Sequence, residues 1–194
     1  MFDLSLPAEV LAPLLVGALL SDGDVVLRLT EVEAYGGTDD PAAHAWRGPR
    51  PHTMDLFAAP GTLYCYRSHG LHTCGNIVCG TPGGGSAILF RAGRVVTGRE
   101  AVRSRRGSVP ERRLASGPGN LGSAMGWGLA DSGRTFGVGG LGIEPGKPVG
   151  EVVAGPRTGV SVAWTRPWRF WDAADDTVSA YRRSPRIRPE GAVW

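Results

Sequence analysis

Two carboxylates and an aromatic ring stand close together in the stretch Thr30-Glu31-Val32-Glu33-Ala34-Tyr35, at the end of a predicted strand. Side chains alternate between the two faces of a strand, so the pattern predicts one shared face for six residues: Val25, Leu27, Leu29, Glu31, Glu33 and Tyr35. A carboxylate at the rim of a core has a shifted pKa and can act as a general base or nucleophile. A strand that simply leaves the core would show the same pattern, so both interpretations stay open here.

The length and composition of the chain limit what such a site could belong to. The chain has 194 residues, of which 42% are hydrophobic, and we expect residues 1–194 to form a single domain. Thirty glycines and 15 prolines indicate a loop-rich fold. Neither a membrane span nor a secretory signal is apparent. We therefore expect a cytoplasmic protein without a membrane partner.

The sequence predicts neither a metal nor a cofactor. A zinc site would need His69, His72 and Cys74, whose spacing matches none of the common zinc frameworks. The glycine run at 83–85 does not lie between a strand and a helix in the frame of a dinucleotide-binding motif. The three cysteines form no C-x-x-C pair and suit a reducing compartment, where they would be small buried side chains.

Charge is distributed unevenly along the chain. Residues 1–60 hold nine acids against three arginines, whereas the rest of the chain holds 18 Arg and Lys against nine acids. Arginines gather in two clusters: Arg91, Arg94, Arg99, Arg103, Arg105, Arg106, Arg112 and Arg113, and then Arg182, Arg183, Arg186 and Arg188. A phosphate backbone is the natural partner of such clusters, and we expect Arg103, Arg105 and Arg106 to bind phosphate. A coding bias toward arginine is the alternative, because the chain has 20 arginines and one lysine.

The order of the predicted elements indicates the fold class. Turn residues and apolar periodicity predict helices over 7–20, over 98–106 with Thr97 and Glu100 as a capping box, and after 117–120. The same signals predict strands over 24–35, 62–67, 71–79, 86–92, 149–154 and 158–164, with a long loop over 36–61. Strands with inserted helices predict a single α+β domain with a curved, mostly antiparallel β-sheet flanked by short helices.

Several rare residue types at fixed offsets are similar to a known family. They are Glu33-Ala34-Tyr35, His44, Gly61-Thr62-Leu63-Tyr64-Cys65-Tyr66, His69-Gly70, Asn76, Leu89-Phe90-Arg91-Ala92, Ser116-Gly117-Pro118-Gly119 and Arg169-Phe170. With these residues the chain resembles the alkyladenine (3-methyladenine) DNA glycosylases of the vertebrate and bacterial type. The resemblance spans about residues 7–188.

The resemblance implies a hydrolytic reaction carried by Glu33 and Arg91. Glu33 would deprotonate a water that attacks C1′ of a flipped nucleotide while the damaged purine leaves. Arg91 would help to hold that water and the target phosphate. No cofactor is needed for this chemistry. The implied partner is double-stranded DNA with a damaged purine, of the 3-methyladenine, 7-methylguanine, hypoxanthine and ethenoadenine class.

The resemblance also implies a pocket and a wedge. Tyr35, His44 and Tyr66 would stack on the extruded base, and Asn76 would obstruct the 2-amino group of normal guanine. His69 stands where most well-known members have a tyrosine that inserts into the helix. It would serve as a smaller wedge, with Arg67 or His72 as alternatives or helpers.

The family further implies a monomer without an obligate protein partner, in the bacterial cytoplasm and associated with the nucleoid. A strand-nicking lyase would need an amine nucleophile, and Lys147 in a Gly/Pro-rich loop is the only lysine. We therefore expect a monofunctional enzyme.

Two other functions compete with this interpretation. Glu31 and Glu33 would be roughly 7 Å apart along a strand, which would also suit an inverting glycoside hydrolase or a nucleoside hydrolase. A noncatalytic, arginine-rich DNA-binding module, with Glu33 as a structural residue, is the third possibility. We expect Glu31 to pair with a basic neighbour or to support the strand.

Overall fold

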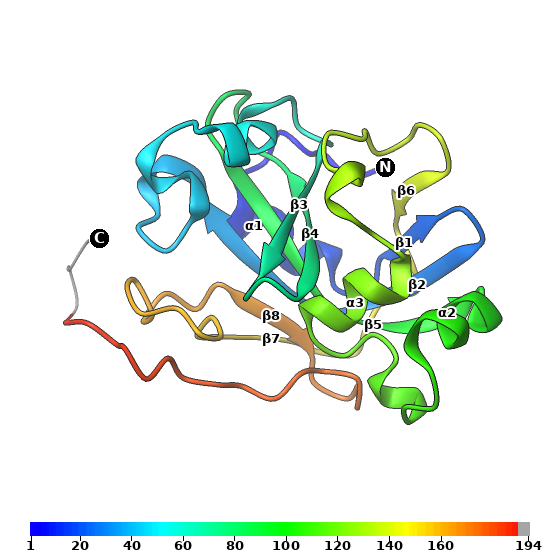
Figure 1. Ribbon diagram of the computed structural model, residues 1–194. Coiled ribbons are helices and arrows are strands. Elements are labelled where there is room, and N and C mark those ends of the chain that lie inside the picture. Colours follow the sequence, from blue (N-terminus) through cyan, green and yellow to red (C-terminus); the bar gives the residue numbers. More distant parts are fainter. Residues whose placement is uncertain (190–194) are drawn as a thin grey trace.

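A single curved β-sheet forms the framework of the computed structural model, which describes residues 1–189 (Figure 1). The strands are β1 (Leu19–Asp22), β2 (Val25–Gly36), β3 (Leu63–Ser68), β4 (His72–Val78), β5 (Ser86–Thr97), β6 (Leu141–Glu144), β7 (Val152–Gly155) and β8 (Arg169–Asp172). The α-helices are α1 (Ala8–Leu15), α2 (Arg99–Arg106) and α3 (Pro118–Met125). Residues 190–194, the end of the predicted domain, lie outside the described residues.

Every strand pair in the sheet is antiparallel. The strand order is β3-β4-β5-β2-β1-β6, and β8 pairs with β2 and with β7. The long strand β2 is central, because its first half lies between β1 and β5 and its second half between β8 and β5. The predicted α+β fold with a curved antiparallel sheet is therefore confirmed.

Strand β2 contains a β-bulge that changes which side chains face the core. Leu29 pairs with Gly93 and Glu31 with Ala92, so Thr30 is an extra residue without a partner in β5. An extra residue shifts the alternation by one position. The main hydrophobic core accordingly contains Leu29 before the bulge but Val32 after it.

The prediction that all six alternating residues share one face was therefore wrong. Val25 and Leu27 point into the main core, and beyond the bulge Glu31, Glu33 and Tyr35 point to the opposite side of the sheet. The carboxylates do not continue the core face. They begin a second, polar interior on the other face.

Several local predictions also need correction. The helix predicted over 7–20 ends at Leu15, because the chain after it gains strand pairing as β1 with both β2 and β6. Helix α2 begins after Gly98, which has left-handed backbone, and the Thr97 hydroxyl donates to the Asp24 carbonyl instead of capping the helix. Residues 158–164 form a loop, while β6 and β8 were not predicted.

The predicted long loop 36–61 contains three short 3₁₀ helices: η1 (Gly37–Asp39), η2 (His44–Arg47) and η3 (Pro51–Phe57). The remaining 3₁₀ helices are η4 (Glu111–Arg113) and η5 (Leu129–Asp131).

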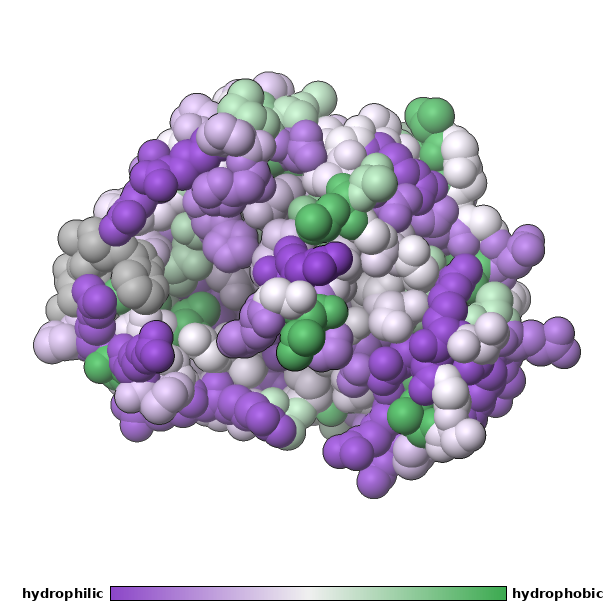
Figure 2. Space-filling model, in the orientation of Figure 1, coloured by the Kyte–Doolittle hydropathy of each residue, from purple (hydrophilic) through white to green (hydrophobic). Residues whose placement is uncertain are grey.

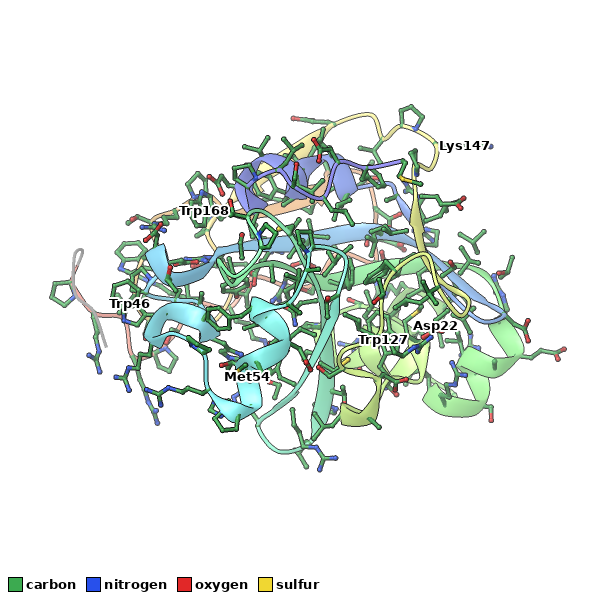
Figure 3. All side chains as sticks on the ribbon, turned by 90° about the horizontal axis from the view of Figure 1, so that it is seen from above. Asp22, Trp46, Met54, Trp127, Lys147 and Trp168 are labelled. Carbon is green, nitrogen blue, oxygen red and sulfur yellow. The ribbon has the colours of Figure 1, made fainter. Side chains whose placement is uncertain are left out.

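Trp127 lies beside Asp22, to which its indole N–H donates at 2.8 Å (Figure 3). This contact ties the end of β1 to the chain that follows α3. Among residues 1–189, no helix has both the length and the apolar character that crossing a bilayer requires.

A polar cluster around Asp175 fixes the chain after β8 onto the central strands. Its carboxylate is 3.0 Å from the Arg28 guanidinium of β2 and 2.9 Å from the Arg94 guanidinium of β5. Burial alone would raise the pKa of Asp175, but hydrogen bonds from Arg94 and Thr177 outweigh it and lower the pKa to about 2. Ion pairs with β2 and β5 thus fix the position of the turn that leads to the C-terminal segment.

We expect Asp175→Asn to remove a pH-dependent part of the stability. Because the pKa of Asp175 is depressed, its contribution is present above the ordinary value of 3.8 and is lost as the pH falls toward about 2. After allowance for solvent screening, the variant should lose about 1 to 2 kcal/mol of unfolding free energy at neutral pH and converge with the wild type at low pH. Urea titrations over this pH range measure the difference.

Asp176→Asn is the matched control, because the Asp176 side chain is 63% exposed although it also contacts Arg94. An equal loss in both variants would contradict the assignment to the buried carboxylate.

Candidate active site

The bulged end of β2 lies against a cavity of about 820 Å³ on the face of the sheet opposite the main core. The four residues that the sequence predicted for the base pocket, Tyr35, His44, Tyr66 and Asn76, all line it, and so does His69, which was predicted as the wedge. They come from β2, η2, the β3–β4 hairpin and β4. Figure 2 shows this side of the molecule hollowed, with hydrophilic residues along the lower edge of the hollow.

Glu33 lies directly behind the lining of this cavity and is completely buried. Its carboxylate accepts hydrogen bonds from the Tyr35 hydroxyl at 2.9 Å, the Arg91 guanidinium at 3.2 Å and the Thr158 backbone N–H at 2.6 Å. Tyr35 and Thr158 themselves line the cavity. A carboxylate offers about four acceptor positions, so three donors leave Glu33 one further position.

Glu31 is buried beside it but has a different environment. It accepts hydrogen bonds from the Arg91 Nε at 2.7 Å and the Arg169 Nε at 2.6 Å, and two more from the backbone N–H and hydroxyl of Ser179. Burial alone would raise the pKa of Glu31, but the charges and hydrogen bonds of Arg91 and Arg169 outweigh it and lower the pKa. Glu31 is therefore an anion paired with two guanidinium groups, and the prediction that it pairs with a basic neighbour is confirmed.

Arg91 connects the two carboxylates. It is the extra residue of β5 at a second irregularity, since Glu31 pairs with Ala92 and Val32 with Phe90. Its guanidinium donates to Glu31, Glu33 and the Ser179 hydroxyl. Burial would lower the pKa of Arg91, but the two carboxylates raise it, so the guanidinium stays charged.

Aromatic rings form one wall of the cavity. The His44 ring meets the Tyr66 ring edge-on at 4.6 Å, and Tyr64 stacks with Tyr66 at 5.8 Å between ring centroids. Burial raises the pKa of Tyr66 and raises that of Tyr64 to about 12. Burial and the neighbouring His52 lower the pKa of His44, so this ring is neutral at neutral pH. The wall is thus aromatic and uncharged.

Tyr35 forms part of the lining and is supported from behind by Arg157. The guanidinium of Arg157 lies 4.7 Å from the centre of the Tyr35 ring and pairs with the buried Asp40 carboxylate. Burial and the adjacent Glu33 raise the pKa of Tyr35, so its hydroxyl remains a donor to Glu33. The ring therefore has a fixed position against the cavity.

The β3–β4 hairpin carries the last two predicted residues. Asn76 is buried, and its side-chain amide donates to the Tyr64 carbonyl at 3.1 Å. His69 is exposed at the tip of the hairpin, has a positive φ of 50°, and lies 3.0 Å from the Ser68 hydroxyl. The histidine ring is thus held at the edge of the cavity.

The arginines of α2 are engaged within the protein. Arg103 contacts the Val109 carbonyl and Glu111, Arg105 contacts the Ala124 carbonyl, and Arg106 contacts the Leu114 carbonyl and Asn120. None of the three lines the cavity. Their visible role is to brace α2 against α3 and the loop between them.

Sequence reasoning missed Thr158 and Ser179, which donate to the two carboxylates, and Arg157 and Asp40, which support Tyr35. No local pattern marks these residues, because each contact joins segments that are far apart in the sequence.

Two buried atoms nearby, the Arg157 Nε and the Thr158 hydroxyl, have no hydrogen-bond partner among residues 1–189. The three cysteines are free and buried, and no group of acidic, histidine or cysteine side chains within the described part could hold a metal.

Comparison with known proteins identifies the family. The methylpurine-DNA glycosylase family matches residues 2–176, and the chain belongs to it. A protein of Cutibacterium acnes is 48% identical over 190 residues, which cover 94% of this chain and 100% of that protein. A protein of Frankia casuarinae is 47% identical, with 94% of this chain and 92% of that protein covered. Both are named, provisionally, as 3-methyladenine DNA glycosylases.

We expect Asp40→Asn to destabilise the protein by about 3 kcal/mol, because it leaves the Arg157 charge buried without its partner. The Tyr35 ring would lose its fixed support at the same time. Urea unfolding measures the change. Asp39→Asn is the control, since Asp39 is exposed, and it should stay within about 0.5 kcal/mol of the wild type. Equal stability of Asp40→Asn and the wild type would disprove the role of this pair.

Proposed function

We propose that the protein is a monofunctional DNA glycosylase that removes alkylated or deaminated purines from double-stranded DNA and so initiates base excision repair. Its substrates would belong to the 3-methyladenine, 7-methylguanine, hypoxanthine and ethenoadenine class. The observation that carries this proposal is the position of Glu33, buried directly behind a cavity walled by Tyr35, His44 and Tyr66. Family membership supports the same activity.

The cavity suits a base that has left the duplex. Its volume lies within the range of small-molecule sites, and its aromatic rings can replace the stacking that the base loses. An electron-poor alkylated purine would gain cation–π attraction from these rings. Asn76 on the buried side would meet the edge of the base, where its amide would clash with the 2-amino group of guanine.

The reaction would use the remaining acceptor position of Glu33. A water bound there attacks C1′, its proton passes to the carboxylate, and the C1′–N bond breaks as the purine leaves with the electron pair. Arg91 would orient the carboxylate and the water. Because Glu33 is inaccessible to solvent in the free protein, the loop at Thr158 would shift when the nucleotide enters.

His69 would fill the gap that the extruded base leaves in the duplex. Its exposed place at the hairpin tip and at the edge of the cavity suits this role. Imidazole is planar but smaller than the tyrosine ring found in well-known members. The protein would act as a monomer, and we propose the cytoplasm and its nucleoid as the place of action.

The environment of Glu31 argues against the glycoside or nucleoside hydrolase. A pair of catalytic carboxylates requires both groups to have an acceptor or proton for the substrate or water. Glu31 already accepts four hydrogen bonds and is completely buried. None of the donors to Glu31 lines the cavity, whereas Tyr35 and Thr158, which donate to Glu33, both do, and this suits a reaction with one catalytic carboxylate.

Glu33→Gln should lower base release by at least about 10²-fold, because the amide cannot accept the proton of the attacking water. Duplex oligonucleotides that contain hypoxanthine or 3-methyladenine are incubated with each protein in EDTA, and abasic sites are revealed with hot alkali. Binding of the same duplexes should survive.

Glu144→Gln is the control, since Glu144 is an exposed acid on β6 outside the cavity. If the wild type releases no base from any lesion, the glycosylase proposal is wrong. If Glu33→Gln releases base at the wild-type rate, the protein is a glycosylase that does not use Glu33.

The abasic product should remain an intact strand. A lyase forms a covalent Schiff base with an amine. Lys147, the only lysine, projects outward on the far side of the molecule from Trp46, which belongs to the same short helix η2 as the cavity residue His44 (Figure 3). We expect no strand cleavage without alkali and no adduct after borohydride reduction, with wild type and Lys147→Gln alike. Nicking by the wild type under these conditions would refute monofunctional chemistry.

A further inference from the structure

The C-terminal segment 179–189, which we call the C-terminal strap, is the red end of the chain in Figure 1. Its residues 182–186 line the cavity. Its first residue, Ser179, is bonded to Glu31 by both its backbone N–H and its hydroxyl. Further along, the Arg182 carbonyl accepts from the Gly159 N–H at 2.9 Å, and the Arg188 N–H donates to the Ser161 carbonyl at 2.8 Å. The strap is therefore held in place by its backbone at three points.

The part of the strap between these points forms a wall of the cavity. Five consecutive residues line it: Arg182, Arg183, Ser184, Pro185 and Arg186. The whole strap contains four arginines and no acid. Among the described residues, Arg182 and Arg186 form no ion pair, and Arg183 lies 5.0 Å from the ring of Trp164. The wall therefore presents positive charge without an internal counterion.

Several arginines earlier in the chain have acidic partners instead. Arg28 and Arg94 pair with Asp175, Arg103 pairs with Glu111, and Arg134 pairs with Asp22. Those charges are neutralised within the fold. Among the described residues that line the cavity, Arg182, Arg183 and Arg186 are the arginines, and none of them forms an ion pair.

We propose that the C-terminal strap is the phosphate-binding wall of the base pocket, and that Arg182 and Arg186 bind the phosphodiester groups on either side of the flipped nucleotide. The inference rests on the proposed function. When a base occupies the cavity, its sugar lies at the mouth and its two phosphates lie just outside, where the exposed guanidinium groups are. A guanidinium binds phosphate oxygens through two parallel N–H bonds.

The fixed backbone of the strap makes this wall effective. A segment that is already ordered loses little conformational entropy when it binds. The exposed edge of His69 and the strap line the same cavity, so the wedge and the phosphate contacts would act on one nucleotide. Damaged DNA would then gain contacts that undamaged DNA, with all its bases stacked, does not make.

The test compares two double variants in a Glu33→Gln background, which keeps the DNA intact. Arg182→Gln/Arg186→Gln removes two charges from the strap, and Arg99→Gln/Lys147→Gln removes two charges from the surface elsewhere. Arg99 is 62% exposed, and within residues 1–189 its one ion pair is with the exposed Glu111, so its loss should cost little stability. Dissociation constants are measured for hypoxanthine-containing and undamaged duplexes of the same sequence over a series of KCl concentrations.

For the damaged duplex, the strap variant should lower the slope of log Kd against log salt by roughly 1.4 to 1.8, or about 0.7 to 0.9 for each lost phosphate contact. Affinity at low salt should fall by about tenfold, and by much less for the undamaged duplex. The control variant should leave the preference for damaged DNA unchanged. Urea midpoints should agree among all variants, because the Arg182 backbone contact does not depend on its side chain.

Two results would overturn the strap proposal. One is an unchanged slope in the strap variant, and the other is an equal loss for damaged and undamaged DNA or for strap and control variants. Failure of the proposed function is recognised separately, because it requires the wild type to release no base in the alkali assay. A wild type that releases base while its strap variant binds normally would reject only the strap assignment.

Discussion

A carboxylate buried in a β-sheet destabilises the protein by several kcal/mol unless it is paired and fully hydrogen-bonded, and β2 carries two such groups. Glu31 meets this requirement with two guanidinium groups and both donors of Ser179. The arrangement fixes Arg91 from one side, so that its remaining N–H groups reach Glu33. The same contacts anchor the start of the C-terminal strap. The network around Glu31 thus decides the geometry of the site without taking part in the chemistry that we propose.

The two bulges explain how one strand can serve both the core and the site. Before Thr30, β2 turns its apolar side chains toward the main core, and after Thr30 the alternation is reversed. The extra residue in β5 is Arg91, directly across from this point. Without the bulges, Glu33 would point into the hydrophobic core, where no donors could compensate its charge. The irregularity of the sheet is therefore what makes a buried polar site compatible with a stable fold.

Segments from the two ends of the chain meet at the cavity. The aromatic wall of the cavity comes from β2, η2 and the β3–β4 hairpin. A second wall comes from the loop 158–164 and the C-terminal strap. Backbone hydrogen bonds join that loop to the strap, so the two form one unit over Glu33. The loop that covers Glu33 and the strap that we propose to bind phosphate therefore belong to one hydrogen-bonded unit.

The amino-acid sequence by itself determined the fold class, the family and the residues of one wall, because these depend on local strand patterns and on fixed offsets within residues 33–91. Tyr35, Tyr66 and Asn76 lie in strands or hairpins whose apolar and turn residues are legible in the sequence. Only the tertiary structure decided the face on which Glu33 lies and the hydrogen-bond partners of Glu31. It also decided that Thr158 donates to Glu33 and that Ser179 donates to Glu31. These depend on a bulge, which has no sequence signal of its own, and on contacts between residues more than 100 positions apart. Periodicity describes how a strand presents its side chains, but the partners that satisfy a buried charge are set by how the whole chain packs.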